Sequence, residues 1–370
     1  MTRLSIGALP PRFDGVRRIA VLRAGGLGDL IFALPAIESL AVAYPDATIT
    51  LLGMPAHAAL LDGRPGVPIH DVEVVPASPG VRNGDSDPGE VQAFAERMRH
   101  RRFDLAVQAH GGGRNSNPFV LRLGARLTVG TATPDAAALT RTLAYDVQQH
   151  EVLRWLEVAG LAGAPAVQLE ATLAARDSEV LQARRRLPAG ERHLVIHPSA
   201  SDPRRRWPPE RFAAVAAAVV REGARVHVVG DAADVPLADS VVAAARELLP
   251  QSRRERVGSL AGALSMSELV GVLAVADLLL GNDSGPRHLA QALGTPTVGL
   301  FWAGNALNAA PLSRSAHRML IGWITHCPIC GADVTRPGWK SPRCEHDPSY
   351  LADIETDDVL DAVRSLLPPS

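Results

Sequence analysis

Two acidic residues, one in each half of the chain, follow short apolar runs that have the pattern of strands. Asp29 ends "RIAVLRAGGLGD" and Asp283 ends "ADLLLGND". A carboxylate placed there can take a proton from a hydroxyl as a general base. It can also do no more than cap the helix that follows, because acids are favoured at helix N-termini. For Asp29, both interpretations stay open on this pattern alone.

A glycine-rich turn lies directly before Asp29. Gly26 and Gly28 supply the first part of the dinucleotide fingerprint G-x-G-x-x-G, but Ile31 occupies the third glycine position. The next strand, 47–53, also ends without the carboxylate that would hold a ribose hydroxyl. We therefore exclude NAD binding at this turn. The turn instead places Asp29 beside the carboxyl ends of the strands, where open α/β sheets bind ligands.

The second half carries two features suited to a diphosphate. Ser284 and Gly285 follow Asp283 at the start of a helix, where exposed backbone N–H groups and the helix dipole favour anions. In "RRRWPPERF", three arginines precede a Pro-started helix, and guanidinium groups bind diphosphate oxygens in a bidentate manner. These are Arg204, Arg205 and Arg206. We expect an anion-binding site from these two features.

Alternating strands and helices must position these side chains. Short β-branched runs alternate with helical stretches, which favours two βαβ sets and an α/β fold of doubly wound parallel sheets. The less regular stretch 161–176 is the expected domain boundary. Strands are expected at 18–22, 47–53, 71–76, 103–110, 193–199, 224–230, 276–282 and 295–301, and helices at 28–43, 90–102, 208–222, 234–249, 266–275 and 284–293.

The composition limits the class of partner. The 370 residues suggest two domains; they are 46% hydrophobic and 21% charged, with a formal net charge of −1. This balance gives no electrostatic reason to expect nucleic acid as a partner. The N-terminus lacks the apolar region of a secretory signal and the longest apolar run is too short to span a bilayer, so we expect a cytoplasmic protein. The basic stretch 96–103 is expected to be a solvated helix face, with contact to the inner membrane surface as the sharper alternative.

Three stretches, in this order, resemble the signature blocks of glycosyltransferase family 9, the heptosyltransferases that build the inner core of lipopolysaccharide. They are "GGLGDLIFALPAIESLAVAYPDATITLLG", "RRRWPPERFAAV" and "NDSGPRHLAQALGTPTVGLF". The resemblance implies a GT-B architecture of two Rossmann-like domains that face an interdomain cleft. It implies an acceptor-side domain over 1–170, a nucleotide-sugar domain over 177–350, and a last helix within 351–370 that packs back on the N-terminal domain.

The same resemblance implies roles for the charged residues. Asp29 matches the acid proposed as the general base, and Asp283 matches the acid that holds hydroxyls of the donor sugar. Arg205 stands where family members commonly carry lysine, and is the implied cation for the leaving diphosphate. Because arginine differs from lysine in geometry, Arg204 or Arg206 stays open as the residue that contacts the diphosphate.

Further candidates belong to the implied donor and acceptor sites. On the donor side they are Ser284 and Gly285 for the diphosphate, His288 for the donor or for a purely structural contact, and His197 and Ser199 for the nucleotide. On the acceptor side they are Gly26, Gly28, His110, Gly111 and Arg114.

The three cysteines of the chain all lie in "CPICGADVTRPGWKSPRCEH". Cys327 and Cys330 have the Cys-x2-Cys spacing of a zinc knuckle, in which two thiolates chelate a tetrahedral ion. Cys344 would be the third ligand, and His346 or His326 the fourth. A metal site and three reduced thiols stay open as alternatives. Relatives that glycosylate autotransporter proteins carry a cysteine-bound iron site in a comparable region, so the ion would be structural zinc or iron. No catalytic metal is expected.

We predict an inverting glycosyltransferase that moves a heptose-like sugar from a nucleotide-diphospho-sugar, with ADP-heptose as the expected donor. The acceptor is a hydroxyl of the lipopolysaccharide core or of another glycan, lipid-linked or protein acceptor. A nucleotide-sugar epimerase of the same architecture is one alternative. A catalytically silent, metal-containing scaffold is the other.

Overall fold

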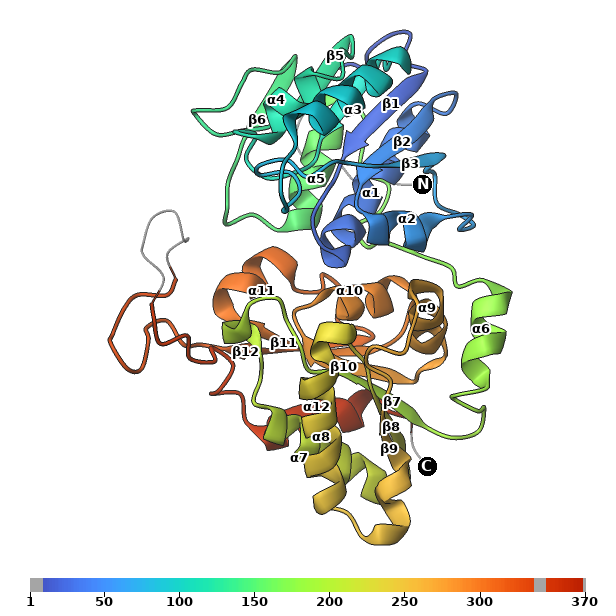
Figure 1. Cartoon of the computed structure of the whole chain (residues 1–370), viewed down its shortest axis with the longest axis vertical. Helices are drawn as coiled ribbons and strands as arrows, with labels where there is room; N and C mark the ends of the chain where they lie inside the picture. The colour runs from blue at the N-terminus through green and yellow to red at the C-terminus, as the bar shows by residue number, and fades with distance from the viewer. Residues whose placement is uncertain (1–8, 336–343, 369–370) are drawn as a thin grey trace. The chain divides into compact units, whose positions relative to one another are not determined.

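The computed structural model describes residues 9–335 and 344–368. The chain divides into two compact units, Met1–Ala174 and Ala175–Ser370, each built on one six-stranded sheet with helices on its faces (Figure 1). This division falls inside the stretch 161–176 that the sequence analysis treats as a boundary. Every strand pair in both sheets is parallel.

The sheet of the first unit has the order β3-β2-β1-β4-β5-β6. Its two central strands, β1 and β4, are almost wholly buried because helices cover both faces, as parallel sheets require. The strands are β1 (Arg18–Leu22), β2 (Thr48–Gly53), β3 (Asp71–Val74), β4 (Leu105–Gln108), β5 (Leu127–Ala132) and β6 (Arg141–Ala144). The helices are α1 (Leu27–Ala43), α2 (Pro55–Leu61), α3 (Pro88–His100), α4 (Ser116–Leu121) and α5 (Glu151–Leu161).

The sheet of the second unit, β12-β11-β10-β7-β8-β9, repeats that order when it is read from the other edge. Its central strands are β7 and β10, and both are fully buried. The strands are β7 (His193–His197), β8 (Arg225–Val228), β9 (Val257–Ser259), β10 (Leu278–Asn282), β11 (Thr297–Trp302) and β12 (His317–Gly322). The helices are α6 (Asp177–Arg184), α7 (Pro209–Arg221), α8 (Val235–Glu247), α9 (Met266–Val275), α10 (Gly285–Ala292), α11 (Ala303–Ala309) and α12 (Thr356–Leu366), with short 3-10 turns η1 (Pro203–Arg205), η2 (Ala232–Asp234) and η3 (Gln251–Arg256).

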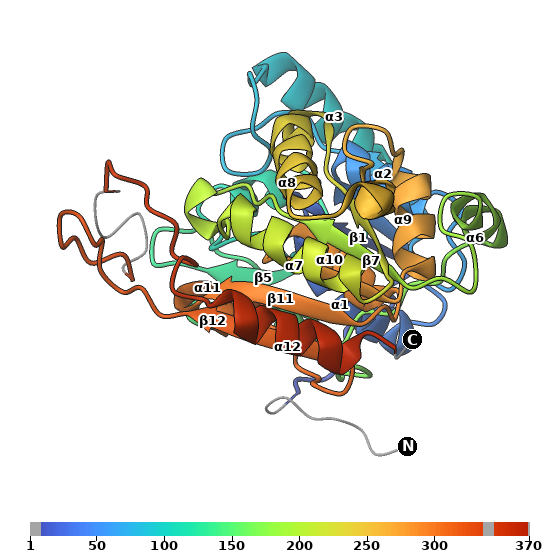
Figure 2. The same ribbon diagram turned by 90° about the horizontal axis from the view of Figure 1, so that it is seen from below.

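The last helix differs from expectation. We expected it to pack on the N-terminal domain, but α12 lies along β11 and β12 and contacts α7 (Figure 2). Val359, Val363 and Leu367 are buried in the same core as the apolar face of α7. The amphipathic pattern predicts which face of a helix is buried but not which layer covers it. The helix belongs to the second unit.

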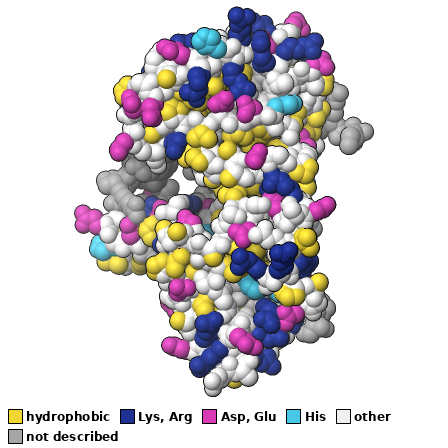
Figure 3. Space-filling model, turned by 45° about the vertical axis from the view of Figure 1, so that its right-hand side comes forward, with side chains coloured by type: hydrophobic (Ala, Val, Ile, Leu, Met, Phe, Trp, Pro, Cys, Tyr) yellow, Lys and Arg dark blue, Asp and Glu magenta, His cyan; other side chains and the backbone are white. Residues whose placement is uncertain are grey.

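The basic stretch at the end of α3 is partly neutralised by its own sheet edge. Arg101 lies 2.6 Å from carboxylate oxygens of both Asp71 and Glu73, and Arg97 stacks on Phe94. Basic and acidic side chains are interspersed over the face drawn in Figure 3. Among the described residues, every helix is too short or too polar to cross a membrane.

The placement of α12 predicts a stability effect. Val363 is fully buried, so Val363→Ala removes apolar contacts and leaves a cavity, and we expect a loss of about 2 kcal/mol in the free energy of unfolding. The matched control is Val42→Ala on α1, where the side chain is 59% exposed and the expected loss is below about 0.5 kcal/mol. Urea unfolding measures both. Equal stability of the two variants would contradict the packing of α12.

Candidate active site

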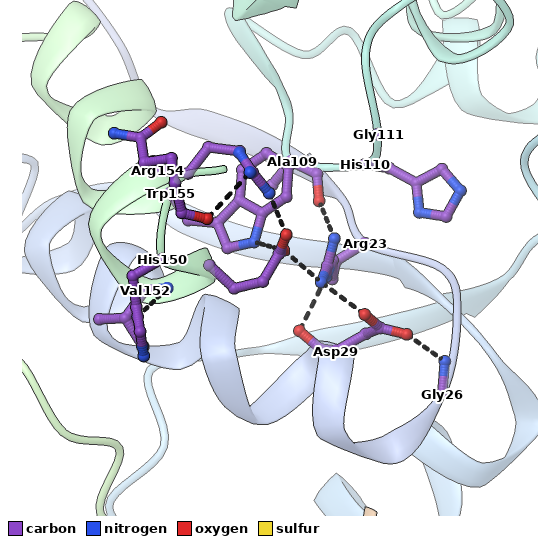
Figure 4. Close-up of polar contacts among 12 residues, drawn as sticks. Arg23, Gly26, Asp29, Ala109, His110, Gly111, His150, Val152, Arg154 and Trp155 are labelled. Carbon is purple, nitrogen blue, oxygen red and sulfur yellow. Dashed lines mark hydrogen bonds and ion pairs between the residues drawn. The ribbon is translucent and has the colours of Figure 1, made fainter. Parts of the chain in front are cut away.

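Asp29 lies in the first turn of α1, just past the carboxyl end of β1 (Figure 4). Its Oδ2 accepts a hydrogen bond from the backbone N–H of Gly26 at 2.7 Å, and its Oδ1 accepts one from Nη2 of Arg23 at 2.8 Å. The side chain is still 45% exposed. The carboxylate therefore caps the helix and also keeps acceptor positions for a substrate hydroxyl, because each oxygen carries two lone pairs.

Arg23 is the buried cation that holds this carboxylate. It is only 3% exposed, and its Nη1 donates to the carbonyl of Ala109 at 3.0 Å, which ties the ends of β1 and β4 together. A buried guanidinium must be neutralised. Besides Asp29, Arg23 has Glu151, with an Oε2 at 3.2 Å. The sequence analysis missed Arg23, although it directly follows the predicted strand 18–22.

Glu151 is the first residue of α5, and its carboxylate accepts hydrogen bonds from further side chains. Nε1 of Trp155 donates to its Oε2 at 2.9 Å, and the buried Arg154 pairs with its Oε1. Figure 4 shows Arg154 and Trp155 on the helix beside Arg23. This side of the site was missed because α5 was not predicted. The sequence signal was an acid followed by apolar residues at helical spacing, in "EVLRWLEVAGL".

Two histidine rings contact backbone carbonyls of the glycine turn. Nε2 of His57 contacts the carbonyl of Gly26 at 3.3 Å, and Nδ1 of His110 contacts that of Ala24 at 3.0 Å. Burial lowers the pKa of His57 to about 4 and also lowers the pKa of His110. Both rings are therefore hydrogen-bonding supports. His110, predicted on the acceptor side, has its Nδ1 engaged by the protein, and His57 was missed.

The other acceptor-side candidates differ in what they offer. Gly26 is the N-cap residue of α1 and Gly28 is buried inside that helix. Gly111 has a φ of +61°, and its carbonyl accepts a hydrogen bond from Thr131 at 2.6 Å, so it shapes a turn. Arg114 pairs with Asp135 at 3.4 Å and is 77% exposed. Of the five candidates, Arg114 is the one with an exposed charged side chain.

In the second unit, Asp283 follows β10 and is surrounded by donors. His288 lies 2.9 Å from its Oδ1, while Arg205 and Asn305 lie 3.2 and 3.0 Å from its Oδ2. Burial alone would raise the pKa of Asp283, but the hydrogen bond from His288 and the neighbouring arginines outweigh it and keep the pKa below its usual value. A buried carboxylate held in this way stays charged and fixed in place.

Arg287 lies against the ring of His288. Its Nη2 is 2.5 Å from Nδ1 and 3.1 Å from Nε2 of His288, and Nε2 lies 2.9 Å from Oδ1 of Asp283. Arg287 is fully buried and stacks on Phe301, and burial lowers its pKa to about 10. The predicted contact residue His288 thus orients Asp283.

The three arginines after β7 point to different partners. Arg204 pairs with Asp202 at 2.6 Å, and Arg206 donates to the carbonyl of Ala200 at 2.8 Å. Arg205 alone of the three reaches Asp283. The sequence left open which of the three contacts the diphosphate, and Arg205 is the one whose side chain lies beside Asp283.

Ser284 is the N-cap residue of α10, and its side chain makes no capping bond. Its hydroxyl contacts Nδ1 of His197 at 2.9 Å, so the N–H groups of the first turn, which begins at Gly285, are left to other partners. Nε2 of His197 lies 3.8 Å from Asp234, and this contact, with a hydrogen bond from Ser199, lowers the pKa of Asp234 to about 2. Asp234 was missed by the sequence analysis.

The three cysteines converge with one histidine. The ligand atoms of Cys327, Cys330, Cys344 and His346 all lie within 4.8 Å of one another. The Sγ atoms of Cys330 and Cys344 are 3.3 Å apart, and Nδ1 of His346 is 3.3 Å from Cys344 and 4.0 Å from Cys327. Ligands of a tetrahedral zinc ion lie about 3.5–3.8 Å apart for zinc–sulfur bonds of about 2.3 Å and zinc–nitrogen bonds of about 2.0 Å. The four residues fit such an ion, and His326 is outside this group.

Two doubly wound parallel sheets, one in each unit, form the GT-B fold. The sequence profile of glycosyltransferase family 9 (heptosyltransferase) matches residues 91–330. The chain belongs to this family.

Curated relatives carry related names. Lipopolysaccharide heptosyltransferase 2 of Salmonella typhimurium is 25% identical over 376 residues, which cover 95% of this chain and 98% of the relative. Lipooligosaccharide heptosyltransferase 2 of Haemophilus influenzae is 32% identical over 129 residues, about a third of either protein. The chain thus spans nearly the whole length of one of these relatives and about a third of the other.

Solved structures show the same fold. The ADP-heptose lipopolysaccharide heptosyltransferase II of E. coli aligns with a TM-score of 0.73 and 20% identity, over 95% of this chain and 98% of that one. The iron-containing dodecameric glycosyltransferase TibC of enterotoxigenic E. coli aligns with a TM-score of 0.53 and 13% identity, over 96% and 78%.

The glycine turn gives a prediction for Asp29. Gly25 has a φ of +107°, and a Cβ added there would lie 2.5 Å from Oδ2 of Asp29. We expect Gly25→Ala to displace the carboxylate and to lower the rate of glycosyl transfer at least about tenfold, as misplaced groups do. In the control Gly66→Ala, φ is +78° and the added Cβ meets nothing within 4 Å.

Both variants carry the same kind of backbone strain, on the order of 1–2 kcal/mol. Urea unfolding should therefore show similar losses of stability, while initial rates should separate the two. If both variants retain full activity, the position of Asp29 does not limit the reaction.

Proposed function

We propose that this protein transfers a heptose-like sugar, with inversion at the anomeric carbon, from a nucleotide-diphospho-sugar to a hydroxyl acceptor. The observation that carries the proposal is the carboxylate of Asp29, held between Arg23 and the N–H of Gly26 at the carboxyl end of β1. Substrates of open α/β sheets bind at this edge. An oriented, half-exposed carboxylate with free lone pairs suits a general base.

In the proposed reaction, Asp29 takes the proton of the acceptor hydroxyl as its oxygen attacks the anomeric carbon. The bond between that carbon and the diphosphate oxygen breaks, and the electron pair leaves with the nucleoside diphosphate. Attack opposite to the leaving group inverts the anomeric configuration. The base provides about 10²–10⁴ in rate when it is well placed.

We assign the binding of the nucleotide-sugar donor to the second unit. Arg205 and the first turn of α10 stabilise the charge on the departing diphosphate. Asp283 is held by His288 and Asn305, and it accepts hydrogen bonds from hydroxyls of the donor sugar with its remaining lone pairs. None of these steps calls for a metal.

The relatives indicate the substrates. The Salmonella relative is named for lipopolysaccharide, and the E. coli structure for ADP-heptose. We therefore propose ADP-heptose as donor and the lipopolysaccharide core as acceptor. With a lipid-linked acceptor, the reaction would take place at the inner membrane surface.

Asp29→Asn tests the base. The amide keeps the shape of the side chain but accepts no proton, so we expect kcat to fall by about 10²–10⁴ while the affinity for ADP changes less than about threefold. The control is Asp46→Asn, at an exposed acid that pairs with Arg17 and should leave kcat unchanged. Transfer from ADP-heptose is followed by release of ADP, and binding by calorimetry.

The same assays distinguish this proposal from the epimerase and the scaffold alternatives. Unchanged turnover of Asp29→Asn removes the base assignment. Conversion of the nucleotide sugar without an acceptor indicates an epimerase. Failure of the unaltered protein to bind either ADP or ADP-heptose indicates a scaffold without catalytic activity.

We also propose that Cys327, Cys330, Cys344 and His346 hold one structural zinc or iron ion. The separations of their ligand atoms support a tetrahedral site, and three thiolates with one imidazole suit either ion. When bound, the ion supplies a cross-link between Cys327–Cys330 and Cys344–His346.

The metal proposal predicts about one zinc or iron ion per chain by elemental analysis of protein purified under reducing conditions. Cys330→Ser should lower the metal content severalfold, because a four-ligand site loses one ligand. His326→Ala, beside the cluster but outside the ligand group, should leave it unchanged. A metal-free protein with a bond between Cys330 and Cys344 would contradict the proposal.

A further inference from the structure

Residues 347–350 directly follow Cys344 and His346, the last two ligands of the cysteine cluster. They contact the turn η1 and Arg206, which together contain the three arginines. Backbone N–H of Tyr350 donates to the carbonyl of Arg204 at 2.7 Å, and the hydroxyl of Ser349 donates to the carbonyl of Arg206 at 2.6 Å. These two carbonyls flank Arg205 on either side. The backbone on both sides of the proposed diphosphate cation is therefore anchored by residues close behind His346.

Side chains strengthen the same contact. Nη1 of Arg204 donates to the hydroxyl of Tyr350 at 3.2 Å, and its guanidinium lies 5.3 Å from the centre of the Tyr350 ring. Asp347 lies 3.9 Å from Nε of Arg204. Arg204 is thus occupied by Asp202 and by this contact, while Arg205 extends to Asp283 and Ser201.

The chain that contains residues 347–350 has little regular secondary structure. Between the end of β12 at Gly322 and the start of α12 at Thr356, the described residues form no helix and no strand longer than an isolated bridge, His326 with Asp333. Cys344 is buried, and Tyr350 packs its ring on Trp302. An ion bound by the cluster would fix the start of this segment, because metal ligation orders chain that does not order itself.

We infer that the metal-binding cluster is a positioning element for the donor site: when loaded, it orders residues 347–350, and these hold Arg205 in place for the diphosphate. The inference rests on the proposed function, since it takes Arg205 as the diphosphate cation. Ser349 and Tyr350 are positioning residues that touch no reacting atom. The ion acts through the chain and takes no part in the reaction.

The test measures ADP affinity and metal content together, on the full chain. We expect Cys330→Ser to lose the ion and to weaken ADP binding about tenfold. Ser349→Ala removes the hydrogen bond to the carbonyl of Arg206 and the one that the hydroxyl accepts from the N–H of Leu351. It should keep the ion and weaken ADP binding about fivefold. The matched control is Ser240→Ala on α8, where the hydroxyl donates only to the carbonyl of Leu237, and both quantities should stay unchanged.

A double-mutant cycle separates positioning from a general loss of structure. Arg205→Ala alone should weaken ADP binding, and adding Ser349→Ala or Cys330→Ser should then cost nothing more, because the group being positioned is gone. Additive losses would overturn the inference. So would unchanged ADP affinity in both Ser349→Ala and Cys330→Ser. Absence of ADP binding by the unaltered protein would instead count against the proposed function.

Discussion

The order of the strands decides where chemistry can lie in each unit. In the first sheet β1 pairs with β2 on one side and β4 on the other, and β7 stands in the same way between β8 and β10. Chains leaving two such neighbours run in opposite directions, which opens the carboxyl edge between them. Asp29 follows β1 and Asp283 follows β10, so each acid lies at this point of its own sheet.

Each acid is held by cationic or hydrogen-bonding side chains, and the two arrangements differ. Asp29 has Arg23 beside it and is half exposed, which leaves its carboxylate accessible from outside the protein. Asp283 is buried among His288, Arg205 and Asn305, which keeps it charged. Arg23 and Asp283 are buried, and a buried charge that loses its partner is costly, so each of them depends on the residues around it.

The sequence predicted strands and helices that have a clear local pattern of apolar residues. The strand 18–22 and the helix at 266–275 agree with β1 and α9 to the residue. Edge strands such as β6 and β9 were missed, because three or four partly exposed residues carry too little periodicity. The helices α5 and α6 and the strands β5 and β12 were missed as well.

The candidate site also contains some residues that the sequence predicted and others that it did not. Asp29 and Asp283 could be found because each lies in the segment that follows a recognisable strand. Their supports could not, since Arg23 meets Glu151 across 128 positions of sequence. Cysteine spacing pointed to a metal site, but the selection of His346 over His326 needed the coordinates. For α12, the resemblance implied a helix, while the core that it packs into came only from the tertiary structure.

The repetition of one strand order in both sheets has a consequence for where substitutions act. The two frameworks are the same, yet the acid follows the first strand in one and the fourth in the other. The two acids thus lie on the segments where strands pass into helices rather than in the two cores. A substitution in such a segment of one unit can therefore change a candidate site residue and leave both sheets unaltered.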